Sequence, residues 1–227
     1  ALALAAALQP LRAEFDADRQ PSRSLKFTDL RATLTAVLSN GKARLLAFGL
    51  FAFAGIQLAF ASFFISFLTL GLEWTLKESG VAYSIAMTSG ILGRLIWGWV
   101  GTHYVRPILL LALLGIAMGV ACMAIGLVAP NWKKAAVWVV AFAYGLTGIG
   151  YQGILLAEIA RVSPPGMAGV ITGGVAFFAY AGMIVMPASF GLILEVFDSY
   201  HLAFIILGTI PMGVGLLFLW SARRIQI

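Results

Sequence analysis

The sequence predicts an all-α integral membrane protein, because its apolar residues fall in long runs and its composition is that of a chain inside a bilayer. Hydrophobic residues make up 61% of the 227 residues, charged residues make up 11%, and the mean hydropathy is +0.98. These values exclude a soluble globular domain. Six apolar stretches are each long enough to cross a bilayer as a helix, at residues 45–70, 80–101, 107–129, 135–159, 167–193 and 200–221.

Residues 1–8, ALALAAAL, form an apolar run that is too short to span a membrane. A signal peptide would carry a basic region before such a run and a cleavage site after it, and neither is present. We therefore interpret residues 1–8 as the tail of a truncated helix and expect further residues upstream of Ala1.

Residues 9–44 are predicted to form a cytoplasmic loop, because basic residues gather there. These residues are Arg12, Arg19, Arg23, Lys26, Arg31, Lys42 and Arg44. Between Phe27 and Leu38 the apolar residues recur at helical spacing, which predicts a short amphipathic helix lying at the membrane interface. Asn40 and Gly41 follow it and are interpreted as its stop signal.

Residues 45–227 are predicted to form a six-helix transmembrane bundle and a short cytoplasmic tail. The basic residues on the side of the 9–44 loop are His103, Arg106, Arg161, Arg223 and Arg224. The opposite side mixes basic and acidic residues, namely Lys77, Lys133, Lys134, Glu73, Glu78, Glu195 and Asp198. This asymmetry predicts a multi-pass protein of the plasma (inner) membrane with both ends of the segment in the cytoplasm. The net charge of +6 does not indicate a nucleic-acid partner, because the basic residues form no face interleaved with aromatic residues.

Polar residues are shared unevenly among the six predicted helices. The third and sixth carry almost none, so they are predicted to be peripheral, while the others face a shared polar interior in a pattern of three plus three. The candidate hydrogen-bonding residues of that interior are Gln57, Tyr83, Tyr144, Tyr151 and Gln152. Tyr144 and Tyr151 are spaced to share one helical face with Thr147.

Arg94 is the most informative single residue, because it lies about two turns inside the second predicted span. An unpaired cation there costs about 2.5–3.5 kcal/mol on insertion scales, so a compensating interaction is expected. One interpretation is that Arg94 binds an anionic group in a cavity; the other is that it reaches the cytoplasmic headgroups or braces a neighbouring helix. Glu158 similarly has two interpretations, as a proton-coupling group or as an ion pair with Arg161, Arg106 or the loop region.

The glycines are interpreted first as packing positions. Gly115 with Gly119, and Gly169 with Gly173, are small residues four apart that let membrane helices approach closely. A second cluster lies inside the fourth predicted span and is expected to pack closely or to bend that helix rather than to cradle phosphate. Its members are Gly145, Gly148, Gly150 and Gly153.

Enzyme classes are disfavoured by the scarcity of reactive side chains. Cys122 is the single cysteine and lies in an apolar span, and the two histidines, His103 and His201, lie in or beside loops on opposite faces. They cannot share a metal ion, and no GxSxG or GxSG motif is present, so we expect no catalytic residues, metal or cofactor. A structural or assembly subunit remains an alternative, although it would not predict a membrane-embedded arginine.

Two stretches resemble the major facilitator superfamily: GRLIWGWVGTHYVRP at 93–107 and PASFGLILEVFDSYHLAF at 187–204, the latter preceded by AEIARVSPPGMAGVITGG. The first resembles the family's loop motif between helices eight and nine. Gly98 matches the first glycine of that motif, and His103 and Arg106 match two of its basic positions. Thr102 stands in place of the aspartate and Val105 in place of the second glycine, so the copy is degenerate.

The resemblance implies that the chain is the C-terminal half of a twelve-helix transporter, with helices seven to twelve arranged as two inverted three-helix repeats. Its partners would then be the missing N-terminal six-helix half of the same polypeptide, the lipid bilayer and a small-molecule substrate that binds between the halves. Gly98, Arg106, Glu158 and Arg161 are expected to form a gate or latch on the cytoplasmic side.

Arg94 with Gly98 and Arg106 also resembles the eighth helix of monocarboxylate and oxalate transporters, in which an arginine anchors the substrate carboxylate. Those monocarboxylate carriers pair the arginine with an aspartate one turn earlier, and here that position is Gly90, so coupling to a proton through such a pair is unsupported. The resemblance implies alternating-access transport of a small organic anion, with Arg94, Gln57, Tyr83, Tyr144, Tyr151 and Gln152 binding the substrate. The alternatives are an efflux carrier of amphiphilic, drug-like compounds and a six-span protein that does not transport.

Overall fold

The computed structural model of the chain describes residues 27–164 and 167–224. The chain divides into two compact units, residues 1–32 and 33–227, so the described part of the first unit is residues 27–32, which begin helix α3 (Phe27–Ser39). All regular structure in the described residues is helical. The predicted truncated helix at residues 1–8 lies outside them.

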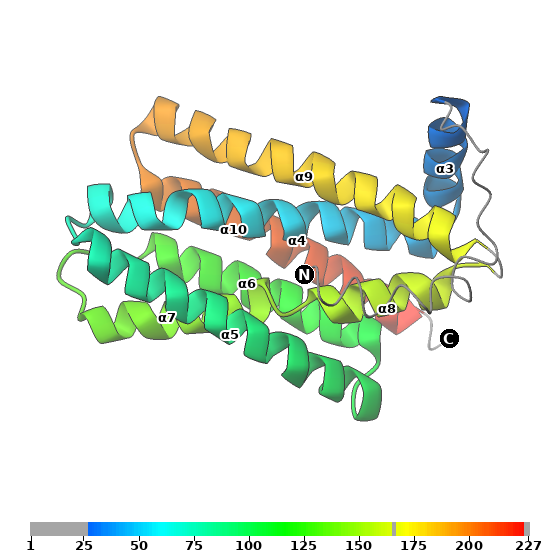
Figure 1. Ribbon diagram of the computed structural model, residues 1–227, viewed down its shortest axis with the longest axis horizontal. Helices are drawn as coiled ribbons and strands as arrows, with labels where there is room; N and C mark the ends of the chain where they lie inside the picture. The colour runs from blue at the N-terminus through cyan, green and yellow to red at the C-terminus, as the bar shows by residue number, and fades with distance from the viewer. Residues whose placement is uncertain (1–26, 165–166, 225–227) are drawn as a thin grey trace, which may run out of the picture. The chain divides into compact units, whose positions relative to one another are not determined.

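The second unit is built from long helices joined by short connections. These are α4 (Gly41–Ser66), its π-helical continuation η2 (Phe67–Gly71), α5 (Leu76–His103), α6 (Pro107–Gly126), α7 (Lys134–Gly148), α8 (Gln152–Val162), α9 (Ala168–Phe197) and α10 (Tyr200–Arg224). The most extensive helix pairings are α6 with α10, α4 with α9, and α5 with α7, and Figure 1 shows α9 lying along α4 and α5 along α7.

Five helical segments in the described residues are long and apolar enough to cross a membrane. They are Gly41–Gly71, Pro107–Gly126, Lys134–Val162, Ala168–Phe197 and Tyr200–Arg223. Each overlaps one of the predicted spans. Helix α5 is 28 residues long but is not among them, because Arg94 and a run of tyrosine, serine, threonine and glycine residues lower its hydropathy. The sixth crossing and the arrangement in inverted repeats stay predictions.

A helix, α3, is present where the sequence predicts a short one, and its position at the membrane interface stays a prediction. The interpretation of Asn40 as a stop signal is incomplete. The Asn40 side-chain oxygen accepts hydrogen bonds from the backbone amides of Lys42 at 3.1 Å and Ala43 at 3.2 Å, so Asn40 is the N-cap of the next helix. For this reason the first span begins at Gly41 rather than at residue 45.

Close packing at glycines is confirmed between α6 and α10. A Cβ added to Gly115 would lie 3.0 Å from the Cα of Gly215, and one added to Gly119 would lie 2.6 Å from the carbonyl oxygen of Gly208. The two helices predicted to be peripheral therefore pack directly against each other.

The described residues show no close packing at Gly169 and Gly173, because a Cβ at either position would meet nothing within 4 Å among them. The buried face of α9 runs through Ile171, Gly174, Val175, Ala179, Gly182, Met186 and Phe190. Gly169 and Gly173 lie off this stripe. Gly182 lies on it, where the backbone of Phe51 on α4 leaves no room for a side chain.

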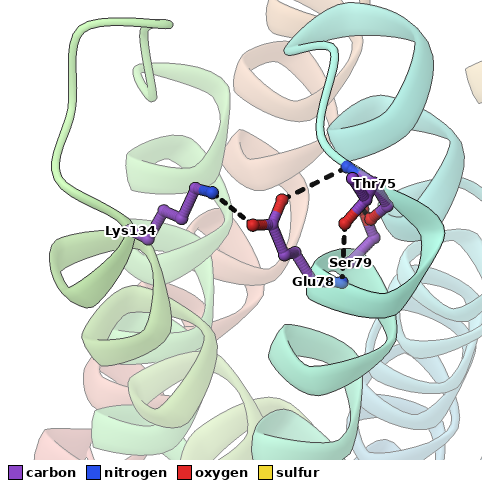
Figure 2. Close-up of polar contacts among 4 residues, drawn as sticks. All are labelled: Thr75, Glu78, Ser79 and Lys134. Atoms are coloured by element: carbon purple, nitrogen blue, oxygen red, sulfur yellow. Dashed lines mark hydrogen bonds and ion pairs between the residues drawn. The ribbon is translucent and has the colours of Figure 1, made fainter.

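The start of α5 is fixed by a capping box and an ion pair (Figure 2). The Thr75 hydroxyl accepts a hydrogen bond from the Glu78 amide at 3.3 Å, and the Glu78 carboxylate accepts one from the Thr75 amide at 3.3 Å. The same carboxylate pairs with the Lys134 ammonium group at the first residue of α7. The contact joins the beginnings of α5 and α7, which pack along each other.

Replacing Glu78 by glutamine is expected to give a small loss of thermal stability that depends on pH. The hydrogen bond from Lys134, and after it the one from the Thr75 amide, hold the pKa of the Glu78 carboxyl below its ordinary value of 4.5. Because the folded-state pKa is the lower one, the stabilisation is complete above about pH 4.5 and is lost as pH falls through the folded-state pKa.

The measurement is the Tm difference between wild type and Glu78→Gln, followed from neutral pH to about pH 3. It should shrink towards zero at the acid end. Glu195→Gln is the matched control, because Glu195 is exposed and has no ionic partner among the described residues. A difference that stays constant across this range would contradict the prediction.

Candidate functional site

The fourth predicted span is interrupted in the middle. Helix α7 ends at Gly148, α8 begins at Gln152, and the turn between them contains Gly150. Such a break leaves backbone carbonyl groups without their helical partners, which is costly in a membrane unless other groups satisfy them. The prediction that the glycine cluster packs closely or bends this helix is thus consistent with the structure.

Side chains of α5 satisfy the carbonyl groups at the break. The Trp97 indole Nε1 donates a hydrogen bond to the carbonyl oxygen of Leu146 at 2.7 Å, and the Arg94 Nε donates a longer one to that of Ile149 at 3.5 Å. Sequence analysis did not identify Trp97 as a hydrogen-bond donor. Trp97 meets the glycine-rich segment only through the packing of α5 against α7, and the sequence around Trp97 does not indicate this contact.

Glycines on both helices allow this approach of α5 to the break. A Cβ at Gly90 would lie 2.6 Å from the side chain of Ile149, and one at Gly93 would lie 3.2 Å from the Cα of Gly150. At Gly145 an added Cβ would collide with the Ala86 carbonyl group. The α5 backbone therefore passes α7 and the break in direct contact.

Four of the six predicted substrate-binding residues form one hydrogen-bonded network next to the break. The Arg94 Nη2 donates to the Gln152 side-chain oxygen at 2.8 Å. The Gln152 side-chain nitrogen donates to the Gln57 side-chain oxygen at 3.2 Å, and the Tyr151 hydroxyl donates to that same oxygen at 3.4 Å. The network thus connects α5, the start of α8 and the middle of α4.

The other two predicted residues, Tyr144 and Tyr83, lie outside the network. The Tyr144 hydroxyl donates to the carbonyl oxygen of Ile56 at 3.1 Å, and its ring stacks on Phe60 at a centroid distance of 4.1 Å. Tyr83 stacks near the same Phe60 ring, at 6.1 Å. Tyr144 is fully buried, so its hydroxyl is a helix-to-helix contact rather than a group free to meet a solute.

The Arg94 guanidinium has an unused hydrogen-bonding edge. Its hydrogen bonds to Ile149 and Gln152 use Nε and one N–H of Nη2, which leaves the N–H groups of Nη1 and the second one of Nη2. Together these form the planar fork that matches a carboxylate. The side chain is exposed, and no acidic residue in the described part of the chain pairs with it. At Gly90, where a carboxylate could have stood one turn away, Ile149 occupies the space.

The predicted gate residues are partly brought together. Glu158 is buried, with 4% of its side chain exposed, and accepts hydrogen bonds from Arg161 at 2.7 and 2.5 Å. The sequence allows Arg161, Arg106 or the loop region as the ionic partner of Glu158, and in the structure the partner is Arg161. Arg106 precedes α6 and lines a cavity with both residues, whereas a Cβ at Gly98 would meet nothing within 4 Å.

No cluster of three or more His, Cys, Asp and Glu side chains in the described residues is close enough to hold an ion. Cys122 is buried, and its thiol contacts the carbonyl oxygen of Phe204 at 3.4 Å, in the packed contact between α6 and α10.

The family model described as Major Facilitator Superfamily matches residues 1–187 of the chain. A search of curated proteins found no match.

Proposed function

Since the chain belongs to the major facilitator superfamily, we propose that it is the substrate-binding half of an alternating-access carrier for a small organic anion such as a monocarboxylate. The family is one of membrane transporters, and the apolar helices are those of a multi-pass membrane protein. In this proposal the substrate carboxylate binds to Arg94, and a second six-helix half encloses the substrate from the opposite side.

The observation that carries the proposal is the state of Arg94. It is a guanidinium group on a predicted membrane helix with no acidic partner among the described residues and with its Nη1–Nη2 edge free. A cation inside a membrane costs free energy unless an anion or water compensates it. A carboxylate from the substrate would supply the missing countercharge.

The residues around Arg94 hold it in place for that role. The Gln152 side chain and the Ile149 carbonyl group accept hydrogen bonds from Arg94. Gln57 in turn holds Gln152, and the Tyr151 hydroxyl bonds to Gln57. A positioned guanidinium binds a carboxylate with less loss of conformational entropy than a free one. The break between α7 and α8 lies against this group, as interrupted helices do at the binding sites of many transporters.

The function is tested by uptake into proteoliposomes that contain the intact protein. We expect saturable uptake of a radiolabelled monocarboxylate, with other carboxylates competing and quaternary ammonium compounds not competing. Liposomes without protein are the control. Uptake of amphiphilic cations in place of carboxylates would overturn the anion assignment and favour the efflux alternative. The same assay repeated with an inward pH gradient tests whether a coupling proton drives the uptake.

A further inference from the structure

A cavity with charged side chains in its walls, separate from the Arg94 network, lies where the ends of four helices meet. Its volume is about 460 Å³, within the range of small-molecule sites. It is lined by the start of α4, the residues that begin α6, the end of α8 and the end of α10. These termini all belong to the side of the bundle predicted to be cytoplasmic.

The cavity carries more positive than negative charge. Its charged side chains are Lys42, Arg106, Arg161 and Glu158. Glu158 is already bound through both oxygen atoms to Arg161, so this pair is internally compensated. The Lys42 and Arg106 side chains have no hydrogen-bonding or ionic partner among the described residues.

The start of α6 adds to this positive charge. The helix has 20 residues, Arg106 is its N-cap residue, and no side chain caps its first amide groups. The helix dipole places a partial positive charge there. Pro107 has no N–H, and the Leu109 and Leu110 amides bond to the Arg106 carbonyl oxygen at 3.0 Å, so the Ile108 amide is the group of this turn that can meet an anion. Two unpaired cations and a helix N-terminus facing one cavity are therefore unbalanced without a bound anion.

The remaining walls of the cavity are apolar, with Leu45, Leu46, Ile108 and Val162 beside the charged groups. A soluble anion would gain nothing from such walls, whereas an amphiphile would place its charged group on the cations and its hydrocarbon part on the leucine side chains. The cavity also lies at helix ends, and in the predicted topology this is the depth of the lipid headgroups.

We propose that this cavity binds the phosphate headgroup of an anionic membrane lipid, with Lys42 and Arg106 as its cationic ligands and the start of α6 as a further contact. The Glu158–Arg161 pair forms the opposite wall. This site is distinct from the transport site, because none of the residues in the Arg94 network lines it.

The test compares two double variants of the intact protein. Lys42→Gln with Arg106→Gln removes the two unpaired cations of the cavity. Lys133→Gln with Arg223→Gln removes the same number of charges from exposed positions outside it. Native mass spectrometry of protein purified in detergent measures the binding of phosphatidylglycerol, with phosphatidylcholine as the neutral headgroup and inorganic phosphate as the soluble anion.

Wild type is expected to bind phosphatidylglycerol in preference to phosphatidylcholine. A basic residue that contacts an anionic headgroup strengthens binding about fivefold, so the cavity variant should bind roughly 25-fold more weakly. The control variant changes residues that do not line the cavity and should bind as wild type does. Equal weakening in both variants, no preference for the anionic lipid, or displacement of the lipid by millimolar phosphate would each overturn the assignment. Gel filtration and the Tm of both variants establish that they are folded.

Discussion

Replacing Arg94 by lysine should lower kcat/KM for carboxylate uptake roughly ten- to a hundredfold. Lysine keeps the charge but loses the planar fork, so it can hydrogen-bond either Gln152 or the substrate with good geometry and not both. A charge-assisted hydrogen bond contributes about 1.5–3 kcal/mol, which sets the size of the expected loss. The measurement is initial uptake rate against substrate concentration in proteoliposomes.

The matched control is Arg223→Lys, because Arg223 lies exposed at the end of α10 and takes no part in the network. It should transport as wild type does. Both variants are quantified in the membrane and by gel filtration, so a loss of folded protein is separated from a loss of function. Unchanged uptake by Arg94→Lys would refute the role of Arg94 as a bidentate anchor and would leave it a brace for the helix break.

Replacing Gly145 by alanine should destabilise the protein by about 1–3 kcal/mol, the usual cost of an overpacked position. The new methyl group would collide with the Ala86 carbonyl group and the Ser89 hydroxyl. The first of these is backbone and cannot move without displacing α5. Because α5 carries both donors to the helix break, we expect uptake to fall together with stability.

The control in the same span is Gly153→Ala, whose Cβ would meet nothing within 4 Å. Alanine there removes a helix-disfavouring glycine, so stability should be unchanged or should rise by up to about 1 kcal/mol. Thermal stability of detergent-purified protein, followed by loss of the monodisperse peak, distinguishes the two variants. Equal Tm values would show that α5 and α7 can separate at Gly145 without cost.

Much of the fold could be predicted because length and apolarity are sufficient to specify a membrane-crossing helix. The positions of α6, α9 and α10 follow from that argument alone. The break before Gln152 could not be predicted in the same way, because four glycines within one span are compatible with packing as well as with bending. The helix can break here because Trp97 and Arg94 donate hydrogen bonds to the carbonyl groups that the break leaves without helical partners.

The candidate site was predictable in its residue types and only partly in its pairings. Polar side chains in an apolar span are marked by their rarity, so Arg94, Gln57 and Gln152 could be selected without a structure. The hydrogen-bond partner of Tyr144 could not be predicted, because it is the backbone carbonyl group of Ile56 and every residue type has such a group. Gly169 and Gly173 likewise have the spacing of a packing pair, but they lie outside the buried face of α9, and spacing alone does not show which face is buried.

The interrupted helix has a consequence for how the protein responds to its own substrate. The Arg94 side chain is shared between the Ile149 carbonyl group, Gln152 and, in the proposed mechanism, the bound anion. An anion that pulls the guanidinium towards itself weakens the hydrogen bonds from Arg94 to the Ile149 carbonyl group and to Gln152. Anion binding and the stiffness of the joint between α7 and α8 are then thermodynamically linked. Such linkage is reciprocal, and any change that loosens the joint alters anion affinity by the same factor. In the proposed mechanism, Arg94 therefore stiffens the joint between α7 and α8 when no anion is bound, and the same side chain binds the anion.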